Sequence, residues 1–79
     1  MPTIPPQPMS ARQVLDAYFL ETRARLLEIA ANLDRMDRAP NLAELRGDSR
    51  LIFIAEALKI LESAAPNRAE LIQRLYSKA

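Results

Sequence analysis

Side chains capable of catalysis are scarce in this chain. It contains no histidine and no cysteine, so the commonest general base, the commonest metal ligand and the sulfur nucleophile are all missing. An active site would have to use carboxylate, lysine, serine or tyrosine groups. The serines all fall at the ends of predicted helices, where capping accounts for them without a nucleophile: Ser10, Ser49, Ser63 and Ser77.

Carboxylates can hold a metal ion in a helical bundle when several of them project from facing helices into one interior. The candidates are Glu21 with Glu28, two turns apart, and Asp34 with Asp37, three residues apart. Glu21 and Glu28 project away from the main apolar face of their helix, and the ExxE spacing of helical magnesium-dependent pyrophosphohydrolases is absent. We therefore expect no metal site and no enzymatic activity. A metal-dependent enzyme that uses carboxylates is the third and last of the functions that we consider for this chain.

Tyrosine and glycine offer little more. Tyr18 and Tyr76 could donate protons, but both lie on apolar faces, where an amphipathic tyrosine usually serves packing. Gly47 is the single glycine, so a glycine-rich phosphate loop cannot form. We expect no catalytic residue and no bound cofactor.

The second function that we consider is that of a small nucleic-acid-associated or regulatory protein. It is suggested by the basic residues, most of which are arginines. The 11 basic and 10 acidic residues are interleaved and give a net charge of +1, so long-range attraction to phosphate is weak. The last two predicted helices resemble a helix-turn-helix, but their turn, residues 64–67, lacks the usual glycine. The last helix would offer few polar side chains to contact DNA bases: Arg68, Gln73, Arg74 and Lys78.

Two short motifs have simple structural interpretations. The spacing of Pro2, Pro5 and Pro8 matches PxxP, but no basic residue flanks it before Arg12, and a flexible tail explains it better. Residues 46–48 spell Arg-Gly-Asp, the tripeptide of integrin ligands. The same residues also suit the start of a helix: Arg46 ends the preceding turn, Gly47 interrupts the helical backbone and Asp48 caps the helix that follows.

The longest predicted helix extends from about Ser10 to Arg38 and has apolar residues on two opposite sides. Each residue lies about 100° further round a helix than the one before. One arc, here called the wide stripe, has the spacing of a core-facing helix and comprises Leu15, Tyr18, Phe19, Thr22, Leu26, Ile29, Ala30, Leu33 and Met36.

The opposite arc, here called the Ala–Leu seam, advances by alternating steps of three and four, as in a short heptad seam. It comprises Ala17, Leu20, Ala24, Leu27 and Ala31. Alanine permits close approach of a second helix, and flanking charges could select its orientation. Alanine and leucine are also good helix formers on a solvated face, and the pattern by itself leaves both interpretations open. The flanking charges are Asp16, Arg23 and Asp34 on one side and Glu21, Glu28 and Arg35 on the other.

The rest of the chain predicts two shorter helices. Residues 42–46 form a short turn, and Asp48 or Ser49 begins a helix that includes Phe53 and Ile60 on a broad apolar arc. Residues 64–66 end it, and Asn67 with Glu70 predicts a capping box for a last helix over residues 68–77. Residues 1–9, rich in proline, form a flexible arm, and residues 10–79 form a single helical domain.

The predicted fold is all-α: a small three-helix up-down bundle in which one long helix packs against a shorter hairpin. A chain of 79 residues without disulfides buries little surface, so we expect completion by dimerisation through antiparallel helices. The leading prediction is a non-enzymatic interaction or oligomerisation module, a homodimer or a partner of another helical protein. Its interface would be the Ala–Leu seam, supplemented by Phe53 and Ile60.

Location follows from the same composition. The longest apolar run is far shorter than the ~20 residues of a membrane span. The N-terminus also lacks the basic and apolar regions of an export signal, so we expect a cytoplasmic protein. In size and composition the chain resembles many short helical proteins of bacteria, a likeness that implies no activity.

Overall fold

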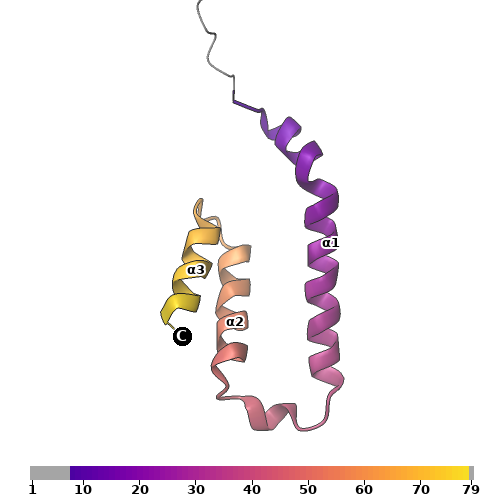
Figure 1. The fold of residues 1–79 in the computed structure, drawn as a ribbon, viewed down its shortest axis with the longest axis vertical. Helices are drawn as coiled ribbons and strands as arrows, with labels where there is room; N and C mark the ends of the chain where they lie inside the picture. The colour runs from indigo at the N-terminus through magenta and orange to yellow at the C-terminus, as the bar shows by residue number, and fades with distance from the viewer. Residues whose placement is uncertain (1–7, 79) are drawn as a thin grey trace, which may run out of the picture. The chain divides into compact units, whose positions relative to one another are not determined.

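The computed structural model describes residues 8–78, and this part of the chain is all-helical, without a strand. Its elements are α1 (Ala11–Arg38), the 3₁₀ helix η1 (Leu42–Leu45), α2 (Ser49–Glu62) and α3 (Arg68–Lys78). The chain divides into two units, α1 in one and η1, α2 and α3 in the other, and each is described by itself. Figure 1 shows α2 and α3 side by side as a hairpin.

Ser10 caps the start of α1, as its position predicts, and it does so in a capping box with Gln13. The backbone N–H of Ser10 donates to Oε1 of Gln13 at 2.8 Å, and the backbone N–H of Gln13 donates to Oγ of Ser10 at 3.2 Å. Two of the N–H groups that a helix start leaves without a backbone acceptor are thereby satisfied. The sequence therefore fixes the first residue of the longest helix through side chains alone.

The break after α1 depends on Pro40 and Asn41. Proline cannot continue the helix, and Asn41 takes a left-handed conformation with φ 68° and ψ 21°. Asparagine tolerates this region better than other residues with a β-carbon. The break expected at Gly47 has a different character, because φ there is not positive and a β-carbon would meet nothing within 4 Å. The left-handed residue of this connection is Asn41.

Asp48 caps α2, as predicted. Its Oδ1 accepts the backbone N–H of Arg50 at 2.9 Å, and its two carboxylate oxygens also accept Nε and a terminal nitrogen of the Arg50 side chain at 3.0 and 2.8 Å. The hydrogen bonds from Arg50, together with its charge, lower the pKa of Asp48 to about 2. One carboxylate thus serves the cap and a bidentate ion pair, which leaves the Arg-Gly-Asp tripeptide with a structural role.

The turn between α2 and α3 is fastened by side chains at the end of α2. Oγ of Ser63 donates to the carbonyl of Ile60 at 2.6 Å, and Nε of Arg68 donates to the carbonyl of Ser63 at 2.9 Å. Asn67 and Glu70 meet through their side chains, with Nδ2 3.4 Å from Oε2, rather than through the side-chain-to-backbone bonds of the predicted box. Arginine thus satisfies a carbonyl that the helix end leaves open.

Of the predicted bounds, those of the three helices and of η1 agree with the structure to within a residue or two. Within the described residues, no helix combines the length and the apolar character that a membrane span requires. The up-down arrangement of the whole chain and its dimerisation stay predictions. So does the single domain over residues 10–79, while most of the arm over residues 1–9 lies outside the described residues.

The pKa of Asp48 makes the start of α2 sensitive to acid. Because its folded-state pKa is depressed, its contribution to stability is present above the ordinary value of 3.8 and is lost as the pH falls through about 2. We expect the carboxyl resonance of Asp48 to titrate near 2 in an NMR experiment, with loss of the Arg50 amide shift over the same range.

The matched variant is Asp48→Asn, which keeps a capping oxygen but removes the charge that pairs with Arg50. The difference in helical content between the two proteins should shrink as the pH is lowered from 4 toward 2. An Asp48 that titrates at its ordinary value would show that the ion pair with Arg50 does not form in solution.

Candidate interaction surface

The Ala–Leu seam lies within one continuous helix, as its spacing requires. All five of its members fall inside α1, 28 residues without a break, so their steps of three and four keep them on one side. Leu20 is 75% exposed and Leu27 is 55% exposed in the single chain. Ala17 and Ala24 are exposed as well, and Ala31 is half-buried. The seam is thus an apolar strip open to solvent for most of its length.

The wide stripe on the opposite side of α1 is also open toward the N-terminus. Leu15, Tyr18, Phe19 and Leu26 are each more than half exposed, whereas Leu33 and Met36 near the end of the helix are half-buried. A solitary helix has no interior, so both arcs need neighbours to exclude water. Both faces of α1 are therefore candidate contact surfaces.

Local ion pairs occupy some of the charges beside these faces. Arg25 holds Oε1 of Glu21 through Nε at 3.3 Å and a terminal nitrogen at 2.9 Å, a hydrogen bond that raises the pKa of Arg25. Arg35 donates to Oδ1 of Asn32 at 2.8 Å. Over residues 8–78, neither Asp16 nor Arg23 takes part in an ion pair. These two charges beside α1 remain available to a second molecule.

Phe53 and Ile60, the other two predicted interface residues, belong to α2. The ring of Phe53 packs edge-on against Tyr76 of α3, with centroids 5.7 Å apart and planes at 72°. This geometry is the favoured one for an aromatic pair. Phe53 and Ile60 are both half-buried. Phe53 therefore has a role inside the hairpin, in addition to any contact it makes with a second molecule.

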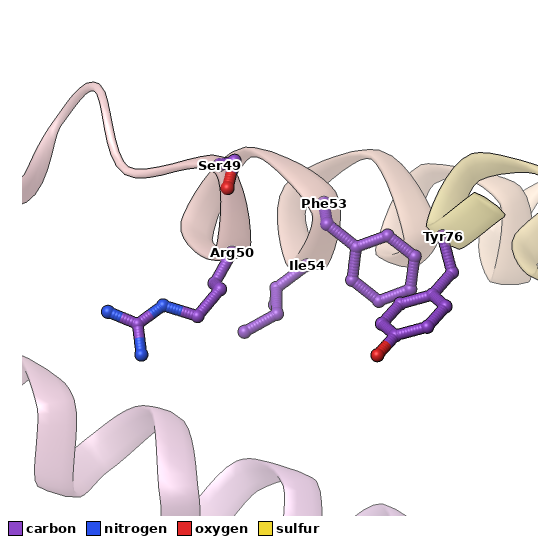
Figure 2. Close-up of a pocket in the computed structure, with 5 residues that line it drawn as sticks. All are labelled: Ser49, Arg50, Phe53, Ile54 and Tyr76. Carbon is purple, nitrogen blue, oxygen red and sulfur yellow. The ribbon is translucent and has the colours of Figure 1, made fainter. Parts of the chain in front are cut away.

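An open apolar hollow of about 250 Å³ lies beside this aromatic pair. In Figure 2 the side chains of Phe53, Ile54 and Arg50 point to the same side of α2, and Tyr76 approaches from α3. Its lining is almost wholly apolar, with Arg50 as the charged member and Ser49 at the start of the helix. The sequence placed Phe53 and Tyr76 each on an apolar face, but it predicted neither their contact nor the hollow, because both depend on how the two helices of the hairpin cross.

Four carboxylates in the described residues form ion pairs with cations, those of Glu21, Asp48, Glu56 and Glu70. Glu56 lies 3.3 Å from Lys59, and Glu70 lies 2.6 Å from Arg74. Over the same residues, no group of three or more His, Cys, Asp or Glu side chains is placed to hold a metal ion. The acidic candidates Glu21 and Glu28, and Asp34 and Asp37, are thus not part of such a cluster.

The arginines show a similar pattern of local use. Arg25, Arg50 and Arg74 pair with carboxylates, and Arg68 donates to the backbone of Ser63. Arg68 and Arg74 are two of the polar side chains considered for contact with DNA bases. Each already has a partner within the chain.

Comparison with known protein families, characterised proteins and solved structures finds no match for this sequence.

The aromatic contact gives a test of the hairpin. Phe53→Ala removes the edge-on contact and most of a half-buried ring, so we expect the free energy of unfolding to fall by about 2 kcal/mol. Urea unfolding followed by far-UV circular dichroism measures it. The control Ile52→Ala truncates a side chain that is 52% exposed and should cost less than half as much.

Tyr76→Phe keeps the ring and should be close to neutral, which separates ring packing from the hydroxyl. If Phe53→Ala acts only at protein concentrations where chains associate, the ring serves an intermolecular contact instead of the hairpin.

Proposed function

We propose that this chain is a non-enzymatic protein–protein interaction module whose working surface is the Ala–Leu seam of α1. In the simplest case the second helix comes from another copy of the chain and the module is a homodimer. The observation that supports the proposal is the exposure of Leu20 and Leu27, aligned with three alanines on one side of a 28-residue helix whose other side is also apolar.

The lengths of the helices support the need for a partner. α1 has 28 residues and is about 42 Å long, whereas α2 and α3 have 14 and 11 residues and reach about 21 and 17 Å. A hairpin of that size can cover only part of one side of α1. The Ala–Leu seam and the wide stripe lie on opposite sides, so at least one of them needs a cover from another molecule.

The residue types of the seam suit contact with a helix. Alanine at Ala17, Ala24 and Ala31, seven residues apart, allows a second backbone to come close along the whole strip. Leu20 and Leu27 lie between them as the side chains that fill the gap. Full burial of a leucine contributes about 1.5–3 kcal/mol, so even two exposed leucines per chain can offset part of the cost of association.

Low burial within the described residues supports the proposal. In the described part of the chain no hydrophobic side chain is fully buried, although 49% of the whole sequence is hydrophobic. Hydrophobic burial is the main term that offsets the entropy of folding. A chain of this composition therefore gains most of its missing burial when it binds another helix.

Charge placed on the seam tests the proposal. Leu20→Glu with Leu27→Glu should abolish association through the seam, because two carboxylates would have to be buried between helices, while circular dichroism should show that the variant stays helical. Sedimentation equilibrium at several concentrations measures the mass. We expect the unaltered chain to exceed the monomer mass at high micromolar concentration and the variant to show a smaller mass.

The matched control is Asn32→Glu with Gln73→Glu, which adds the same charge at exposed positions outside the seam. It should associate like the unaltered chain. A seam variant that associates as tightly as the unaltered chain would rule out the seam as the working surface, and an unaltered chain that is monomeric at these concentrations would rule out the homodimer.

A further inference from the structure

We propose that the N-terminal half of the wide stripe is a second contact surface, which pairs with the same surface of a second copy in antiparallel orientation. The pairing is centred between Leu20 and Glu21. The surface is distinct from the Ala–Leu seam and faces the opposite way on α1. The inference is therefore independent of the proposed function.

The spacing of this half is that of a heptad seam. Leu15, Phe19, Thr22, Leu26 and Ile29 follow one another by alternating steps of four and three, and α1 holds them on one side of an unbroken helix. Thr22 is the polar member of this row. Its Oγ1 donates to the carbonyl of Tyr18 at 2.8 Å, so the hydroxyl is satisfied inside the helix and does not need a partner across an interface.

Antiparallel pairing about a twofold axis between residues 20 and 21 stacks complementary layers. Leu15 of one copy lies across from Leu26 of the other, and Phe19 lies across from Thr22, so a large ring meets a small side chain. Because the axis is twofold, each layer occurs twice. The fifth member of the row, Ile29, lies across from Arg12, whose aliphatic stem can cover it, and no two rings meet.

The charges at the edges of the surface select this alignment. In antiparallel pairs, residues on the same edge of the two helices face each other. On one edge Asp16 of each copy then faces Arg23 of the other, and on the other edge Tyr18 faces Arg25, a pairing that suits the face of an aromatic ring. Asp16 and Arg23 make no ion pair with another described residue. They are therefore available for this contact.

Other alignments lack this complementarity. Shifting the register by one heptad brings Arg23 against Arg23 and Arg25 against Arg25. On the Ala–Leu seam, the antiparallel alignments that place both leucines of each copy against alanines of the other bring Glu21 against Glu21 or against Glu28. Like charges directly opposite are unfavourable. The wide stripe thus complements itself in one register, whereas the seam does not do so in the antiparallel alignments that use both of its leucines.

The exposed area is consistent with a weak, specific contact. Leu15, Tyr18, Phe19 and Leu26 are 61%, 58%, 53% and 57% exposed. Each offers on the order of 100 Å² of side-chain surface, so two copies would bury on the order of 800 Å². Interfaces of this size lie at the low end for specific complexes, so we expect a dissociation constant in the micromolar range.

Charge reversal and exchange test the inference. Asp16→Arg places two arginines opposite each other at both ends of the pair, and it should weaken association by about tenfold in sedimentation equilibrium. The double variant, Asp16→Arg with Arg23→Asp, exchanges the two charges and should restore the dissociation constant to within about threefold of the original. In a parallel pair these residues are not neighbours, so restoration is specific to the antiparallel register.

Two controls keep the outcomes separate. Glu62→Arg makes the same change in net charge on α2 and should leave association unchanged, while circular dichroism checks that every variant keeps its helices. The seam variant, Leu20→Glu with Leu27→Glu, reports on the proposed function alone. Loss of association in the seam variant, with no effect of Asp16→Arg, would overturn this inference and leave the proposed function standing. The inference would also be overturned if Asp16→Arg weakens association and the added Arg23→Asp substitution does not restore it.

Discussion

The structure depends on a constraint of helix geometry: a single helix has no interior and buries a side chain only where a neighbour lies against it. α1 has 28 residues with apolar side chains on two opposite sides, and the hairpin of α2 and α3 is too short to cover even one side along its full length. Much of the apolar surface of α1 is exposed in the single chain. The fold is better understood as a set of well-defined helices than as a closed core.

Local side-chain contacts define these helices. The capping box of Ser10 and Gln13, the Asp48 cap and the Arg68 contact to the carbonyl of Ser63 satisfy backbone groups at helix ends. Each contributes on the order of 1 kcal/mol, and exposed ion pairs contribute less. Such contacts fix where a helix begins and ends, but they do not replace hydrophobic burial. The secondary structure is thus specified within the chain.

The sequence predicted the helix bounds well because they depend on short-range chemistry. Ser10 with Gln13, Asp48, Pro40 and Pro66 act within a few residues, and their effects can be inferred from spacing. Ion pairs were harder to predict. A spacing of four residues on a helix predicts pairs of Glu21 with Arg25 and of Glu70 with Arg74, and both pairs form.

Two other pairs predicted by spacing, Arg12 with Asp16 and Asp34 with Arg38, do not form among the described residues. Both pairs that form place glutamate four residues before arginine, which is the favourable order on a helix. Arg12 precedes its acid, and the aspartates have a shorter reach than glutamate. The pairing of Arg50 with Asp48 and the hollow beside Phe53 could not be predicted, because they depend on the local geometry at a helix start and on the crossing of two helices.

Two apolar faces on opposite sides of one helix raise the problem of unlimited assembly. If both faces bound a second copy in the same way, each dimer formed through one face would still expose the other face of both chains. Further copies would then add until a closed symmetry was reached. The like charges that meet across the Ala–Leu seam in an antiparallel pair oppose that outcome. They disfavour antiparallel pairing through the seam and leave other orientations of the bound helix permitted. In the pairing proposed above, the wide stripe determines how two copies meet in antiparallel orientation. The seam, the proposed working surface, would then take a helix in a different orientation, from another copy or from a different protein, and the arrangement of Glu21, Arg23 and Glu28 would determine which helices it admits.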